Sequence, residues 1–112
     1  MMTFCNRMLL AASLVTLAGT AAQAAQLSGD EFVATHAGKC FTYTGPSPGK
    51  ECYNTDGTAT YDDASYGKNN GSWSIRGDQV CTRYRGEGLS CGPITRVNGN
   101  TYTDGEYTWT IK

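Results

Sequence analysis

The chain has 112 residues, of which 17% are charged and 11% aromatic, and its net charge is −1. This length fits one small domain. The near-neutral charge, without a basic tract or an acidic tail, argues against a nucleic-acid partner.

Residues 1–24 have the pattern of a secretory signal peptide. Arg7 gives a positive start, residues 8–18 are almost entirely apolar, and residues 22–24 (Ala-Gln-Ala) form a small-x-small cleavage site. We therefore expect export and removal of this segment, which leaves residues 25–112 as a single small β domain.

A membrane anchor is the alternative interpretation of the apolar run. The run is shorter than the ~20 residues that span a bilayer. A lipoprotein would carry a cysteine directly after the cleavage site, where this chain has Ala25. We expect a periplasmic or secreted protein that is monomeric and has no membrane anchor.

Four cysteines follow the cleavage site: Cys40, Cys52, Cys81 and Cys91. An even number in a short exported chain indicates disulfides, here two. Three pairings are open, and we predict Cys40–Cys52 and Cys81–Cys91 because a glycine-containing turn lies midway between the members of each pair. A zinc site is the alternative, but the spacings are much longer than C-x-x-C and an oxidising location disfavours thiolate ligands.

A short helix is predicted at residues 29–37. Ser28 and Glu31 form a capping box at its start, and Gly38 is suited to ending it. A helix of two turns is not stable alone, so it must pack on the rest of the domain. Its expected inward-facing residues are Phe32, Val33 and Ala37.

After Gly38 the chain has the texture of an all-β protein. Short strands separated by glycine-containing turns favour an antiparallel meander that closes into a small barrel or sandwich. Residues 62–70 are expected to be a polar connection, and Pro93 should weaken strand pairing after Cys91. The predicted strands are residues 39–44, 50–54, 58–62, 72–76, 79–85, 94–97, 101–103 and 106–111.

The central feature is a hairpin around Gly77-Asp78. A two-residue turn there pairs Trp73 with Thr82. Because side chains alternate along a strand, Trp73 and Val80 face the core, and we predict that Trp73 is buried. In the last hairpin, Tyr102 is expected opposite Tyr107.

Three segments together resemble a family of small exported bacterial β-proteins of unknown function. They are Leu27-Ser28-Gly29-x-Glu31, Asp56-Gly57-Thr58, and Gly71-x-Trp73-x-Ile75-x-Gly77-Asp78-x-Val80-Cys81. The resemblance covers roughly residues 27–91. It implies a periplasmic or secreted location and a fold with a short N-terminal helix before a sheet, and it brings no catalytic residue.

No catalytic motif is present in the sequence. The one histidine, His36, falls in the last turn of the predicted helix, where a structural or solvent-facing role is expected. Asp62, Asp63, Asn69 and Asn70 are typical calcium ligands, but their spacing does not fit an EF-hand, so a solvated loop is favoured. We expect no cofactor, no metal and no enzymatic activity.

Arginine is the best candidate for partner contact. Arg76, Arg83 and Arg85 share the outer face of the central hairpin, and Leu89 lies in the next loop. A solvated face is the favoured interpretation of these charges. An anion- or partner-binding patch is the alternative, because arginine suits bidentate contacts with carboxylates or phosphates. The sequence therefore predicts a non-enzymatic binding or inhibitor-like module whose partner is an unknown protein or envelope component. The alternative is a small structural or stress-related envelope protein without a discrete ligand.

Overall fold

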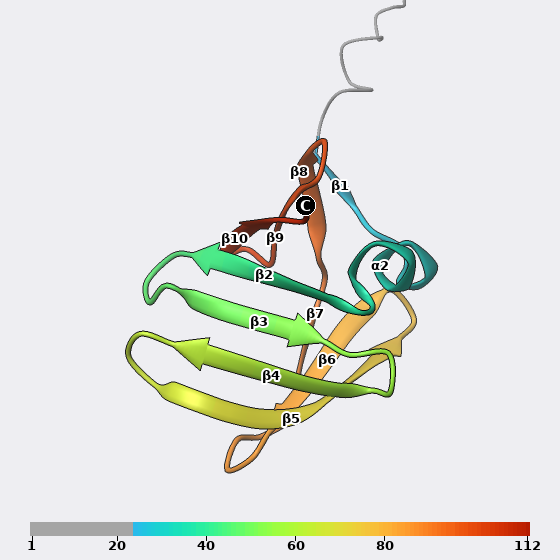
Figure 1. Cartoon of the computed structure of the whole chain (residues 1–112). Helices are drawn as coiled ribbons and strands as arrows, with labels where there is room; N and C mark the ends of the chain where they lie inside the picture. The colour runs from blue at the N-terminus through green and yellow to red at the C-terminus, as the bar shows by residue number, and fades with distance from the viewer. Residues whose placement is uncertain (1–23) are drawn as a thin grey trace, which may run out of the picture.

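The computed structural model describes residues 24–112 (Figure 1). The signal peptide expected at residues 1–24 therefore lies outside the described residues, except for Ala24. The elements in chain order are β1 (Ala25–Gln26), α2 (Gly29–His36), β2 (Lys39–Thr44), β3 (Gly49–Tyr53), β4 (Thr58–Asp63), β5 (Gly67–Arg76), β6 (Gln79–Tyr84), β7 (Ser90–Gly92), β8 (Thr95–Asn98), β9 (Thr101–Thr103) and β10 (Thr108–Thr110).

The strands form one antiparallel sheet that curls into a half-barrel (Figure 1). Strands β2 to β7 are a meander in which each strand pairs with the next, and β8 to β10 are a second meander. The two are joined where β10 pairs with β2, and β1 adds to the free side of β8. The prediction of a mainly β protein with one short N-terminal helix is confirmed.

The helix α2 begins as predicted, with the Ser28 hydroxyl accepting from the Glu31 amide at 3.1 Å and the Glu31 carboxylate accepting from the Ser28 amide at 2.8 Å. It buries Phe32 and His36, which lie four residues apart and hence on one face. The prediction that Val33 faces inward is wrong, because Val33 is 42% exposed. The buried face of the helix is formed by Gly29, Phe32 and His36, and Val33 lies beside it.

The turn between β5 and β6 holds the N-terminal segment in place. Asp78 accepts a hydrogen bond from the Gly29 amide at 3.0 Å through its carboxylate. Its carbonyl accepts from the Gln26 side chain at 3.2 Å. The capped start of α2 is therefore fixed to the central hairpin, and the helix is seated against the concave face of the sheet.

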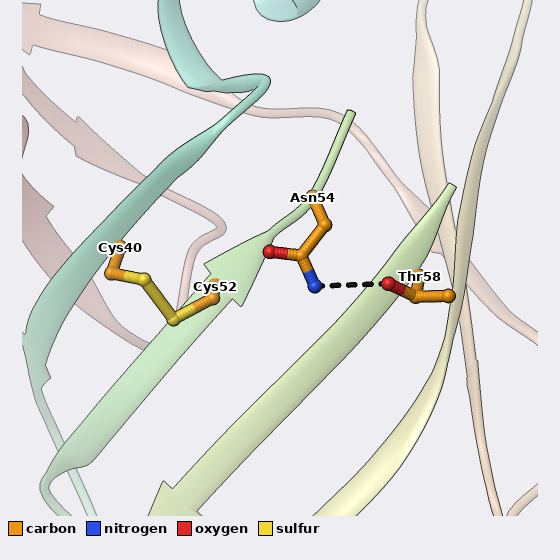
Figure 2. The surroundings of a disulfide bond; sticks show 4 residues. All are labelled: Cys40, Cys52, Asn54 and Thr58. Carbon is orange, nitrogen blue, oxygen red and sulfur yellow. Dashed lines mark hydrogen bonds between the residues drawn. A yellow bond between two sulfur atoms is a disulfide. The ribbon is translucent and has the colours of Figure 1, made fainter. Parts of the chain in front are cut away.

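Both predicted disulfides are present. Cys40 and Cys52 lie directly opposite each other on β2 and β3 (Figure 2), and Cys81 and Cys91 do so on β6 and β7. Two disulfides indicate an oxidising, non-cytoplasmic location. Within residues 24–112, no helix is long and apolar enough to cross a membrane.

The stretch expected to be a polar connection is instead a hairpin. Asp62 pairs with Lys68 and Asp63 with Gly67, so β5 begins at Gly67, which has a φ of 75° that favours glycine. The expectation is wrong because polar side chains do not by themselves prevent strand pairing. Here one face of the hairpin meets solvent and the other borders a polar cavity, so polar side chains suit both faces.

The register of the last hairpin also differs from the prediction. Tyr102 lies opposite Trp109, not Tyr107. The reason is the turn: the Asp104 carboxylate accepts from the amides of Glu106 and Tyr107 at 2.9 and 2.7 Å. This lengthens the loop, and β10 starts only at Thr108.

The central hairpin has the predicted register, with Trp73 opposite Thr82. Trp73 is half-buried and packs on the core, edge-to-face with Phe32 and Tyr53 at 5.9 and 5.6 Å between ring centroids. Its indole N–H donates to the Asn54 carbonyl at 2.8 Å. The core position is thus correct, although the side chain keeps part of its surface in solvent.

Candidate functional site

The concave face of the half-barrel is divided into two halves. On each of β2, β3 and β4, one inward-facing residue belongs to the buried core and the inward-facing residue two positions away lines a cavity. Phe41, Tyr53 and Ala59 belong to the buried core, and α2 packs on the first two of them. We call these three residues, together with Phe32 and His36 of α2, the covered half. Beyond it, a cavity remains uncovered, and we call five of its lining residues the open half: Tyr43, Glu51, Tyr61, Asp63 and Tyr84.

The cavity over the open half has a volume of about 550 Å³, which is in the usual size range for small-molecule sites. Ten of its thirteen lining residues are tyrosines or carboxylates, the others are Thr82, Ser90 and Trp109, and none is a lysine or arginine. The tyrosines are Tyr43, Tyr61, Tyr66, Tyr84 and Tyr107, and the carboxylates are Glu51, Asp63, Glu87, Asp104 and Glu106. Five of the seven tyrosines of the chain therefore lie around one cavity.

Asp63 is the most heavily bonded carboxylate of the open half. It is only 7% exposed, and it accepts hydrogen bonds from the hydroxyls of Ser47 and Tyr43, the latter at 2.7 Å. The amides of Ser65 and Tyr66 donate to it at 2.8 and 3.1 Å. These donors, Ser47 first, lower the pKa of Asp63 to about 2. The solvated loop expected here is wrong for Asp63.

Glycine at position 49 makes this arrangement possible. Tyr43 lies opposite Gly49 on β3, and Gly49 lies opposite Asp63 on β4. A β-carbon on Gly49 would collide with the Tyr43 hydroxyl. The tyrosine therefore reaches across a whole strand, over the bare glycine, to donate to the carboxylate.

Glu51 occupies the border between the two halves. Its carboxylate accepts from the Tyr84 hydroxyl and from the Tyr53 hydroxyl, the latter at 3.2 Å. Burial raises the pKa of Glu51, and the two tyrosine donors only partly offset this effect. The pKa of Tyr84 is raised by the same burial and by the neighbouring Glu51, so the phenol keeps its proton and donates.

The outer rim of the cavity is polar and accessible. The Tyr61 hydroxyl donates to the Glu87 carboxylate at 2.6 Å, and this contact raises the pKa of Tyr61. The Tyr61 ring packs edge-to-face on Tyr84, with 4.5 Å between centroids. Tyr66 is 75% exposed. Aromatic rings and carboxylates are thus both accessible to solvent at the mouth of the cavity.

His36 takes no part in this site. It is fully buried in the covered half, stacked on Phe32 with 4.2 Å between ring centroids. The Trp109 indole N–H donates to its Nε2 at 3.0 Å. Since indole is only a donor, Nε2 is the acceptor and the ring proton is on Nδ1, 2.7 Å from the Thr35 hydroxyl. Burial lowers the pKa of His36 to about 4. The imidazole is a neutral structural group.

The predicted arginine site is not part of the cavity. Arg76 and Arg83 sit at alternating positions of the β5–β6 hairpin that face away from it, and Arg85 follows the end of β6. All three are exposed, and Leu89 is 40% exposed in the loop before β7. The structure thus leaves these four residues available on the surface, and their role in binding stays a prediction.

The cavity is not predicted by the sequence, and Asp63 is its one lining residue that is singled out there as a candidate site residue. One signal was available: in the Thr-Ala-Thr-Tyr-Asp-Asp run of β4, Ala59, Tyr61 and Asp63 alternate on one face. That pattern shows a strand whose inward face becomes polar toward one end. The convergence of Tyr43, Glu51 and Tyr84 depends on strand order and had no local signal.

The carboxylates of the cavity are spread around its wall. In the described part of the chain, no group of three or more His, Cys, Asp or Glu side chains is arranged to hold a metal ion. The cavity wall instead combines dispersed carboxylates with hydroxyl groups and aromatic rings.

Comparison with protein-family models, with curated proteins and with solved structures finds no match for this chain.

Proposed function

We propose that this chain is an exported, non-enzymatic binding module, periplasmic or secreted, that contacts an unknown protein or envelope component through the open half of its concave face. The observation that carries the proposal is the cavity of about 550 Å³, whose wall combines five tyrosines with five carboxylates. Tyrosine is favoured at recognition surfaces because it adds large contact area and a polar hydroxyl with few rotatable bonds.

The rigidity of the scaffold supports a binding role. Cys40–Cys52 joins β2, which carries Tyr43, to β3, which carries Glu51, and Cys81–Cys91 joins β6, which carries Tyr84, to β7. The hydroxyls of Tyr43 and Tyr84 are already bonded to carboxylates before any ligand arrives. A preorganised surface loses little conformational entropy on binding, which increases affinity.

The fate of the reactive side chains supports a non-enzymatic role. The ring nitrogens of His36 are bonded in the core, to Trp109 and beside Thr35. The four cysteines of residues 25–112 are paired as disulfides. Asp63 accepts four hydrogen bonds from its own chain and is held ionised, which suits a structural carboxylate better than a general acid.

Export rests on the signal peptide predicted at residues 1–24 and on the two disulfides. Intact-mass measurement of the protein recovered outside the cytoplasm should give a chain that begins at Ala25. A chain that retains Met1 would contradict export with cleavage.

The test of binding is capture of a partner by the oxidised mature chain, immobilised and exposed to an envelope extract in native conditions. We expect one stoichiometric partner. The cavity variant is Tyr61→Ser with Glu87→Gln, both at the accessible rim, and it should capture less.

The matched control carries Arg83→Ser and Arg85→Ser on the other face. Equal capture by this control and the parent assigns contact to the cavity alone. A loss of capture, together with a weaker salt dependence, would assign contact to the predicted arginine surface. Capture of nothing specific by any of the chains would contradict the binding module and favour a structural envelope protein.

A further inference from the structure

We propose that the group bound in the open half is an alkylammonium cation. The inference rests on the proposed function, in that it takes the cavity to be the binding surface, and it names the chemistry that the bound group must carry. The size of the cavity, its charge and its tyrosine rings support this chemistry.

Charge decides the sign of the ligand. Five carboxylates line the cavity and no lysine or arginine does, although the described chain contains eight such residues elsewhere. Asp63 is fully ionised at neutral pH, because its pKa is about 2. A negative cavity with low-dielectric walls concentrates cations and disfavours anions.

The dispersed arrangement decides the size of the cation. Carboxylates that bind a metal ion converge on one point within coordination distance, and no group in the described residues does so. Glu87 instead lies at the mouth, bonded to Tyr61 at 2.6 Å, while Asp63 lies on the wall under Tyr43 at 2.7 Å. Charge spread around a cavity of about 550 Å³ suits a bulky organic cation.

The tyrosines favour an ammonium group over a neutral polar ligand such as a sugar. Tyr61 packs edge-to-face on Tyr84 at 4.5 Å, and Tyr43 packs edge-to-face on Tyr107 at 5.1 Å. In an edge-to-face pair, the edge of one ring covers one face of the other ring, so the remaining ring faces are not covered by that partner. Ring faces attract cations within about 6 Å of the centroid, and this attraction grows as water is removed.

The test is titration of the oxidised mature chain with choline, followed by the NMR signals of the tyrosine rings and of the Trp109 indole. The matched ligand is 3,3-dimethylbutan-1-ol, which has the same shape and no charge. We expect choline to bind with a Kd on the order of 1 mM and the neutral alcohol at least about fivefold more weakly. The affinity for choline should fall as salt is added.

The variant for this test is Glu87→Gln, which keeps an oxygen acceptor for the Tyr61 hydroxyl and removes the charge. The control is Asp62→Asn, an exposed carboxylate next to Asp63 that points to the opposite face of β4. We expect Glu87→Gln to weaken choline binding about three- to fivefold and Asp62→Asn to leave it unchanged. Glu106→Gln, at another exposed lining position, gives a second measurement with the same expected direction.

Three results would overturn the inference: no binding of choline, equal binding of the neutral alcohol, or equal weakening by Glu87→Gln and Asp62→Asn. Each of them leaves partner capture untouched, so failure here is distinguishable from failure of the binding module. A further arm replaces choline by Nα-acetyl-lysine methylamide. Tighter binding of the lysine derivative assigns the cation to a protein side chain, and tighter binding of choline assigns it to a quaternary ligand; both support the inference.

Discussion

The covered half and the open half are built on the same face of the same strands, and they differ in almost every property. Phe41 and Tyr43 are two residues apart on β2, yet Phe41 stacks on Trp109 at 5.0 Å while Tyr43 donates to a carboxylate. One buried titratable group from each half illustrates the contrast. His36, whose ring nitrogens meet neutral partners, is held neutral; Asp63, with four donors, is held ionised.

The difference teaches that the helix decides the chemistry of the concave face. Where α2 packs, water is excluded and the strands bury aromatic rings. Where it ends, the strands present hydroxyls and carboxylates to a cavity. An eight-residue helix thus closes one half of a half-barrel and leaves the other half uncovered.

The largest expected effect breaks the covered half. Phe32 is 1% exposed at the centre of the aromatic cluster, so Phe32→Ala should lower the free energy of unfolding by about 3–5 kcal/mol. That is much of the stability of a small domain. Denaturant unfolding at pH 7.5 measures it.

The neighbour Val33 provides the matched control, because it lies on the solvent side of the same helix and is 42% exposed. Val33→Ala should change the free energy of unfolding by about 0.5 kcal/mol or less. Similar losses for both variants would mean that α2 does not cover the sheet as described.

The next effect concerns pH. His36 has a pKa of about 4 in the folded chain and 6.5 when unfolded, because burial, and more weakly Arg96 and Lys39, disfavour the imidazolium. The unfolded chain therefore takes up a proton first as pH falls. The contribution of His36 to the free energy of unfolding should be at its maximum above pH 6.5, and it should fall by about 3 kcal/mol as the pH is lowered toward 4.

Thermal unfolding of the parent between pH 7.5 and 5 measures this slope. His36→Gln is the comparison: it is less stable at every pH, and its melting temperature should be flat between pH 6.5 and 5, above the range in which most carboxylates titrate. A flat parent profile would contradict the neutral, buried imidazole.

A smaller effect is expected from the hydrogen bond between Tyr43 and Asp63 in the open half. Tyr43→Phe removes the hydroxyl that donates to Asp63 at 2.7 Å and should lower the free energy of unfolding by about 1.5–3 kcal/mol at pH 7. The pKa of Asp63 is lowered by folding, so its stabilisation is present above pH 4 and is lost as pH falls toward 2. The difference between the parent and Tyr43→Phe should therefore shrink over that range, and a difference independent of pH would show that the charge of Asp63 is not involved.

The smallest effect is expected at the rim. Glu87 is exposed and contacts Tyr61 and Asn69 at 2.6 and 3.5 Å. Glu87→Gln should change the free energy of unfolding by about 0.5 kcal/mol or less, as an ordinary surface substitution does. The melting temperature should therefore change little. A large loss of stability would mean that Glu87 holds the rim together. The Glu87→Gln variant could then not separate an effect on binding from an effect on folding.

The elements with local signals were predictable from sequence. The capping box of Ser28 and Glu31, the Gly77-Asp78 turn and the two disulfide pairs are each encoded within a dozen residues or so, and each is present. The open half is different, because Tyr43, Asp63 and Tyr84 meet only through the order of five strands. The predicted register around Asp104 is wrong because the Asp104 carboxylate accepts from two amides of the turn and the start of β10 moves to Thr108.

The arrangement of the two meanders has a consequence for the order of folding. Every pairing from β2 to β7, and both disulfides, join neighbours in sequence, whereas β1 with β8 and β2 with β10 join segments more than sixty residues apart. Local contacts form first because closing short loops costs less chain entropy. We expect the β2–β7 meander to fold and oxidise first, and docking of β8–β10 to be the slow step. Until β10 arrives, Trp109 cannot reach His36, so the final strand of the chain completes the core around the helix.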